Sequence, residues 1–354
     1  MKAAKGYNTA TIDVAIKAIC QFERETGNRS FQNFHIAQAQ AFKRRLAASR
    51  NTHTGKPLSK STISQTLKAV QKFFLWLADQ PGFRSRIKYS DCEYFTPDRR
   101  DARSVTTAIS RPVPSLEQIR HVIAAMPSDT QLERRDRAVV DFAILTGVRD
   151  RALISLRMKH VDVTARRVIQ HGGEVHTKAG KTIETIFFPV GEEIEAIVME
   201  WLEFLRVENL FGSEDPVFPR TMITTGNEGF RSDGVARESW KTADTVRKIF
   251  RAAFEAAGLA PVNPHSFRHT LAQYGERICQ TPEQFKAWSQ NLGHEHVSTT
   301  FTSYGRVPPH RQAELIGGLA AAPARENALL GEIDRIADAV ANRLSDRSEG
   351  ARER

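Results

Sequence analysis

The sequence has few cysteines, no long apolar run and, in its first 80 residues, few acidic side chains. The three cysteines, Cys20, Cys92 and Cys279, lie far apart and form no CxxC pair. Neither a disulfide framework nor a cysteine-rich zinc site is therefore indicated. No stretch of eighteen apolar residues occurs, and the N-terminal residues lack the uninterrupted apolar region of a signal peptide. We therefore expect a cytoplasmic protein without a membrane partner.

The scarcity of acidic residues near the N-terminus leaves a strong excess of positive charge there. Residues 1–80 contain thirteen Lys and Arg against four Asp and Glu, so this segment carries +9 of the net charge of +10. Such an excess favours a polyanionic partner, with DNA as the main candidate. A lysine-rich solvated surface is the alternative explanation. The candidate DNA-binding side chains are Lys43, Arg44, Arg45, Lys60 and Lys68.

Length and hydrophobic pattern predict two domains that are mainly α-helical. The chain has 354 residues, of which 40% are hydrophobic, enough for two cores. One predicted helix, residues 59–78, has its apolar side chains on a single face. They are Ile63, Leu67, Val70, Phe74 and Leu77. The predicted organisation is a helical domain over residues 1–82, a linker over 83–113, a second domain over 114–310 and a tail over 311–354.

Local signals predict where the other helices begin and end. Ser115 and Gln118 form a capping box at the start of the second domain, and Gly147 permits a left-handed backbone after a helix. The predicted helices are residues 9–26, 33–49, 59–78, 116–125, 132–145, 192–207, 242–257, 265–279 and 282–292.

A small antiparallel β-sheet is expected within the second domain. Residues 167–171, 174–176 and 183–189 alternate in polarity or carry β-branched side chains, and glycine-containing turns separate them. Lys178 falls at the tip of the second predicted hairpin. The predicted fold class is therefore mainly α with a small antiparallel sheet.

An ordered set of side chains in the second domain suits chemistry on a phosphodiester. A phosphodiester gains negative charge on its nonbridging oxygens during attack, and planar guanidinium groups such as those of Arg149 and Arg268 match that charge. A hydroxyl that attacks phosphorus holds the DNA end covalently, and a histidine within reach can take its proton. Tyr304 is the candidate nucleophile and His265 the candidate base.

These residues stand in segments that resemble a known family. The run TGVR, the segment HTKAGK, then HSFR, LGH and a tyrosine ten residues after the last histidine resemble the tyrosine recombinases of the phage integrase family. The resemblance extends from about Asn8 to Arg306. Each fragment is weak alone, whereas five in this order form a specific signal.

The resemblance implies a fold and a set of roles. It implies a helical core-binding domain, then an α+β catalytic domain that cleaves DNA through a 3′-phosphotyrosyl link and frees a 5′ hydroxyl. Lys178 would protonate the leaving 5′ oxygen, and His294 would bond a nonbridging oxygen. No metal, nucleotide or other cofactor is required, since the covalent link keeps the bond energy.

The resemblance also implies partners. They are double-stranded DNA with inverted-repeat sites and further copies of the chain, which would assemble as a homotetramer on two sites. Companion recombinases or accessory factors are further candidate partners. The expected location is the nucleoid within the cytoplasm.

One departure from the family pattern lies beside Arg149. The family usually has an acidic residue three positions after this arginine, whereas this chain has Ala152, with Asp150 and Arg151 nearer. Another acceptor must then orient Arg149, and the sequence does not identify it.

Several alternatives remain open at this level. Lys181 rivals Lys178 as the general acid, and Tyr274 rivals Tyr304 as the nucleophile. A histidine-rich metal site is a competing explanation, but no carboxylate or cysteine has the ligand spacing to complete it. At the level of function, the rivals are a type IB topoisomerase and a noncatalytic DNA-binding accessory factor of the same fold.

The C-terminal tail carries a separate amphipathic pattern. Its apolar residues recur at helical spacing between residues 329 and 344. We expect a helix there that docks on an adjacent protomer, with packing inside its own chain as the alternative.

Overall fold

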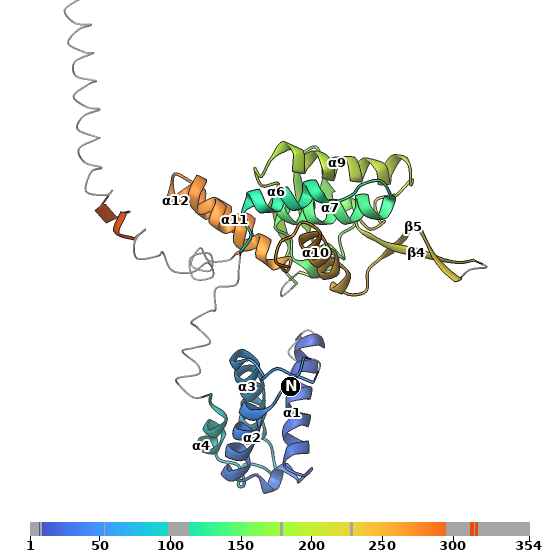
Figure 1. The fold of residues 1–354 in the computed structure, drawn as a ribbon. Helices are drawn as coiled ribbons and strands as arrows, with labels where there is room; N and C mark the ends of the chain where they lie inside the picture. The colour runs from blue at the N-terminus through green and yellow to red at the C-terminus, as the bar shows by residue number, and fades with distance from the viewer. Residues whose placement is uncertain are drawn as a thin grey trace, which may run out of the picture. The chain divides into compact units, whose positions relative to one another are not determined.

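The computed structural model describes residue 7 and residues 9–52, 54–97, 113–177, 180–226, 229–294, 312–314 and 316–317. Its contacts divide the chain into one unit over Met1–Gly293 and a second over His294–Arg354. Figure 1 shows the helices and strands of the first unit. Among the described residues, no helix has both the length and the apolar character needed to cross a membrane. The predicted tail helix at residues 329–344 lies outside the described residues.

Three long helices, which the sequence pattern predicts, make up most of the N-terminal domain. They are α1 (Thr9–Glu25), α2 (Ile36–Ala48) and α3 (Lys60–Leu77). A capping box starts α2, because the His35 ring accepts from the Ala37 N–H at 3.2 Å and Gln38 Oε1 accepts from the His35 N–H at 2.9 Å. Ser59 caps α3 through the Thr62 N–H at 3.1 Å. Unpaired amides at both helix starts are thereby satisfied.

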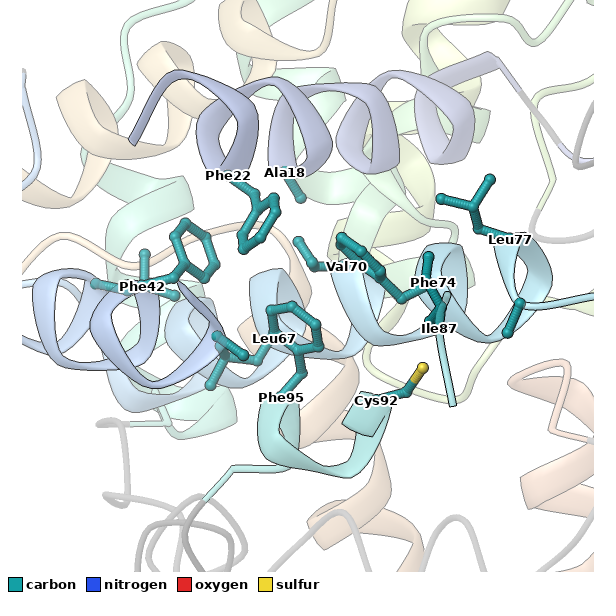
Figure 2. Packing of buried hydrophobic residues seen from close by; sticks show 13 residues of the cluster. Ala18, Phe22, Phe42, Leu67, Val70, Phe74, Leu77, Ile87, Cys92 and Phe95 are labelled. Carbon is teal, nitrogen blue, oxygen red and sulfur yellow. The ribbon is translucent and has the colours of Figure 1, made fainter. Parts of the chain in front are cut away.

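Aromatic packing on the predicted face of α3 builds the N-terminal core (Figure 2). The ring of Phe74 lies with its centroid 4.4 Å from Phe34, 5.2 Å from Phe22 and 5.2 Å from Phe95. Such pairs stabilise the core beyond the free energy of simple area burial. Of the five residues assigned to this face, four are buried and Ile63 packs partly buried at the edge.

The N-terminal domain continues past the predicted start of the linker at residue 83. Residues 83–97 carry α4 (Tyr89–Cys92) and the short 3₁₀ helix η3 (Glu93–Phe95). Ile87, Cys92 and Phe95 join the same apolar cluster as Phe74. The polar composition of this segment makes its few buried apolar residues hard to recognise in the sequence, and the N-terminal core includes residues as far as Phe95.

Six longer helices form the second domain: α6 (Leu116–Ala125), α7 (Gln131–Thr146), α9 (Glu192–Val207), α10 (Asp244–Ala256), α11 (His265–Ile278) and α12 (Pro282–Asn291). Helix α7 packs against α6, α9, α10 and α11 (Figure 1). Every residue of α7 from Ala138 to Thr146 is buried. The predicted capping box holds at α6, where Ser115 Oγ accepts from the Gln118 N–H at 3.2 Å. Helix α7 is therefore the central element of this domain.

A three-stranded antiparallel sheet follows α7, in the order β1 (Val161–Asp162), β2 (Arg167–Gln170), β3 (Ile183–Ile186). Strand β2 pairs directly with β3, with Val168 opposite Thr185. The prediction of a strand at residues 174–176 is wrong. The N–H groups of Glu174 and Val175 instead both donate to His171 O, at 3.0 and 2.8 Å, and form a turn. Local alternation misleads here because none of the strands in the described part of the chain pairs with this segment to complete a ladder.

A long two-stranded hairpin, absent from the sequence prediction, extends away from the helices (Figure 1). It consists of β4 (Pro219–Gly226) and β5 (Gly229–Ser239). Its register shifts twice, and the bulges break the strict alternation by which a strand is recognised. The buried guanidinium of Arg135 on α7 holds its base, with Nη1 donating to Pro219 O at 3.1 Å.

We predict that Phe74→Ala destabilises the N-terminal domain by about 3–5 kcal/mol, because it removes a fully buried ring that the neighbouring rings cannot replace. Urea unfolding of the full chain, followed by circular dichroism, measures the change in the free energy of unfolding. Val14→Ala on α1, where the side chain is 55% exposed, is the control and should change it by no more than about 0.5 kcal/mol. Equal stability of both variants would contradict the packing described above.

Candidate active site

The turn after α7 places Arg149. Gly147 ends α7 with φ 60° and ψ 17°, the left-handed conformation that the sequence predicts. A Cβ at this position would lie 3.0 Å from side-chain carbons of both Leu271 and Leu292. Only glycine therefore suits both the backbone and the space. Val148 turns into the core, and Arg149 is left half-buried at the start of the short helix α8 (Asp150–Leu153).

Arg268 on α11 joins the segments that carry the other candidate residues. Its side chain is 4% exposed, and two guanidinium nitrogens donate to the backbone carbonyls of Gly147 and Leu292. Gly147 lies two residues before Arg149, and Leu292 lies two residues before His294. The sequence predicts Arg268 as a phosphate ligand. In the structure the same guanidinium also holds two backbone segments together through its hydrogen bonds.

His265 begins α11, one turn before Arg268. The residue is exposed at the surface, yet partial desolvation of its ring, followed by the electrostatic effects of Arg268, His269 and Arg149, lowers its pKa to about 4. Arg268 follows His265 by three residues on the same helix, so its charge lies close to the ring. A neutral histidine at physiological pH can accept a proton, as the predicted base must.

An ion pair that the sequence analysis missed lies next to Arg149. Asp150 Oδ2 accepts from Arg247 Nε at 3.0 Å and from Nη2 at 2.8 Å, and Arg247 stands on α10. Arg247 also pairs with Asp244 on its own helix at 3.0 Å. Asp150 thus supplies an acidic group near the position where Ala152, itself buried, replaces the family's usual acid. No local pattern signals this pair, because its members are 97 residues apart.

Asn291 is a second residue that the sequence analysis missed. Its side-chain amide pairs with the backbone of Ile186 as a neighbouring strand would. The amide oxygen accepts from the Ile186 N–H at 2.7 Å, and the amide nitrogen donates to Ile186 O at 2.8 Å. Thr185 Oγ1 also donates to Asn291 O at 3.1 Å. Strand β3 is thereby fixed to the end of α12. Asn291 directly precedes the LGH segment, and this position in the sequence was the only feature that could have marked it as a residue near the site.

The remaining predicted residues belong to other parts of the chain. His294 is half-buried and begins the second unit, directly after Gly293. Lys178 and Tyr304 lie outside the described residues. Among the described residues, no group of three or more histidine, cysteine or acidic side chains comes together as a metal site.

Family models match the chain over both domains. The model of the phage integrase family matches residues 115–311, more than half of the chain, and that of the phage integrase N-terminal SAM-like domain matches residues 1–82. The first match includes the segments of Arg149, His265 and Tyr304.

Individual relatives agree with this assignment. The chain is 26% identical over 289 residues to tyrosine recombinase XerC of Shigella flexneri serotype 5b, covering 80% of each protein. It is 25% identical over 247 residues to XerC of Lactobacillus delbrueckii subsp. bulgaricus, covering 70% of this chain and 72% of the relative.

Solved structures show the same fold. The Tn1549 transposon integrase in complex with transposon right end DNA matches with a TM-score of 0.57 at 15% identity, covering 90% of this chain and 97% of the other. A lambda integrase dimer bound to a COC′ core site gives 0.57 at 14% identity, covering 87% and 94%. The chain belongs to the phage integrase family and is a tyrosine recombinase, an enzyme that cleaves and rejoins DNA in site-specific recombination.

Proposed function

We propose that Tyr304 is the nucleophile of this recombinase and that five basic side chains assist it. They are Arg149, Lys178, His265, Arg268 and His294. The observation that carries the proposal is the arrangement around α11: His265 begins this helix, and Arg268 one turn later donates to the carbonyl of Gly147, two residues before Arg149. Two cations beside a neutral base suit an anionic phosphate that a hydroxyl attacks.

The proposed step exchanges one phosphodiester for another. The Tyr304 oxygen bonds to phosphorus while the bond from phosphorus to the 5′ oxygen breaks, and the phenolic proton passes to His265. Lys178 gives a proton to the departing 5′ oxygen. Arg149, Arg268 and His294 stabilise the charge on the nonbridging oxygens. Attack by another 5′ hydroxyl reverses the step and rejoins the strands without a cofactor.

The proposed substrate is double-stranded DNA with inverted-repeat sites, bound by a tetramer on two sites. The solved relatives bound to DNA, one of them a dimer, support a DNA-bound assembly of more than one copy. The excess of positive charge on the N-terminal domain supports a grip on DNA phosphates. Companion recombinases or accessory factors would join this assembly.

We predict that Tyr304→Phe abolishes covalent capture of DNA while leaving binding intact, because the change deletes only the attacking oxygen. A nicked suicide substrate is incubated with each protein, and adducts are separated on a denaturing gel. Tyr274→Phe is the matched control and should keep the adduct. Capture by Tyr304→Phe would move the nucleophile elsewhere, and the absence of an adduct even in the wild type would favour a noncatalytic accessory factor.

The pH dependence of cleavage follows from the lowered pKa of His265. Protonation of this ring removes the acceptor for the Tyr304 proton, so the rate should fall as pH falls through about 4 rather than through the ordinary value near 6.5. The kcat/KM for adduct formation reports this pKa in the free enzyme. His265→Gln should be slower and should lack this acid limb. A wild-type midpoint near 6.5 would argue against His265 as the base.

Salt dependence tests the proposed DNA grip of the N-terminal domain. Four of the five candidate residues, Arg44, Arg45, Lys60 and Lys68, are exposed, whereas Lys43 is half-buried and donates to Thr96 O at 2.9 Å. Replacing those four with Gln should make the slope of log affinity against log salt shallower by roughly 3 to 4, at about 0.9 per phosphate contact. Filter binding at a series of salt concentrations measures the slope. An unchanged slope would mean that these four residues do not contact DNA phosphates and only form a solvated surface.

A further inference from the structure

The segment between β2 and β3 is held by an ion-pair network centred on Glu174. Glu174 Oε2 accepts from Lys159 Nζ at 2.6 Å and from His160 Nε2 at 3.1 Å. Both partners belong to the 3₁₀ helix η4 (Met158–His160). Lys159 also contacts Glu214 Oε1 at 3.0 Å, and Arg157 contacts Glu214 Oε2 at 2.5 Å. Glu174 thus links the segment to η4, and Lys159 connects it further to Glu214.

The protonation states of this network follow from its geometry. The Arg157 N–H donates to His160 Nδ1 at 2.9 Å, so the neutral ring carries its proton on Nε2 and donates it to Glu174. Burial lowers the pKa of His160, whose side chain is 1% exposed, and favours this neutral form. Hydrogen bonds from Lys159 and His160 lower the pKa of Glu174 to about 2. Glu174 is therefore ionised at physiological pH and accepts both bonds.

Further contacts hold the same segment between β2 and β3 in place, both where its two ends meet and at Val175 and His176. A Cβ on Gly172 would lie 1.8 Å from Gly180 O, so the two backbones touch. Val175 is 2% exposed, and the His176 N–H donates to Ser155 Oγ at 2.9 Å. Ser155 Oγ in turn donates to Ala152 O at 2.9 Å, within the short helix that Arg149 starts. The segment is thereby connected to the Arg149 turn.

We infer that Glu174 is a positioning residue for Lys178. Lys178 follows Glu174 by four residues and lies between Thr177 and Gly180, which are both described. The Glu174 side chain is 42% exposed, and exposed ion pairs add little folding stability. Its contacts fix the course of the segment that leads to the lysine. The inference rests on the proposed role of Lys178 as the acid that protonates the 5′ oxygen.

The leaving group provides a direct test. A 5′-bridging sulfur departs as a thiolate, whose conjugate acid has a pKa of roughly 8.5, and needs no general acid. A variant that misplaces only the acid should therefore cleave the oxygen substrate slowly and the sulfur substrate at nearly the wild-type rate. A variant that damages folding or DNA binding should be slow on both substrates.

The experiment measures single-turnover cleavage of oxygen and sulfur suicide substrates by the full chain and its variants. We expect Glu174→Gln to cleave the oxygen substrate about 10- to 100-fold more slowly, the usual effect of a misplaced catalytic group, and to recover with sulfur. Its DNA affinity and melting temperature should stay unchanged. Glu184→Gln is the matched control, since Glu184 on β3 is 51% exposed and pairs with Arg167 at 2.8 Å. It should behave as the wild type on both substrates.

Lys178→Ala separates failure of the inference from failure of the proposed function. If sulfur rescues Lys178→Ala but not Glu174→Gln, the positioning role of Glu174 is overturned and the role of Lys178 stands. If sulfur does not rescue Lys178→Ala, the general-acid role fails and the inference fails with it. Wild-type cleavage of the oxygen substrate by Glu174→Gln would also overturn the inference.

Discussion

The catalytic domain depends on one buried guanidinium. Arg268 is nearly inaccessible to solvent, and burial of such a charge is costly unless its N–H groups have acceptors. Carbonyls at the ends of α7 and α12 provide two of them, and helix C-termini carry partial negative charge. The turn before Arg149 and the segment before His294 are therefore both held against α11. The residue that the family pattern marks for phosphate binding also holds together the backbone around the site.

Charge is arranged differently in the two domains. The N-terminal domain combines an aromatic core with exposed basic residues and few acids, which suits the proposed contact with DNA phosphates. In the catalytic domain many basic side chains are paired with acids, as in Arg247 with Asp150 and Lys159 with Glu174. Pairing limits general attraction to polyanions, so positive charge can act where the chemistry needs it.

Local sequence signals predicted much of the fold for identifiable reasons. Helical periodicity identified the buried face of α3, a capping box marked the start of α6, and Gly147 adopts the left-handed conformation expected of a helix end. The prediction failed where pairing depends on distant or bulged partners. The turn at residues 174–176 has the alternating polarity of a strand but does not form one. In the β4–β5 hairpin, the register shifts interrupt the alternation by which the two strands would have been recognised.

The sequence by itself determined the identity and order of the candidate catalytic residues and the buried faces of the main helices. These features are encoded in spacing along the chain, where helical and strand periods act directly. Only the tertiary structure decided what supports those residues: Arg268 reaches Gly147 across 121 residues, Asn291 reaches Ile186 across 105, and Arg247 reaches Asp150 across 97. Such hydrogen bonds form only where folding brings distant backbone and side-chain groups together. Local periodicity cannot predict these contacts, because it describes only residues that are close in sequence.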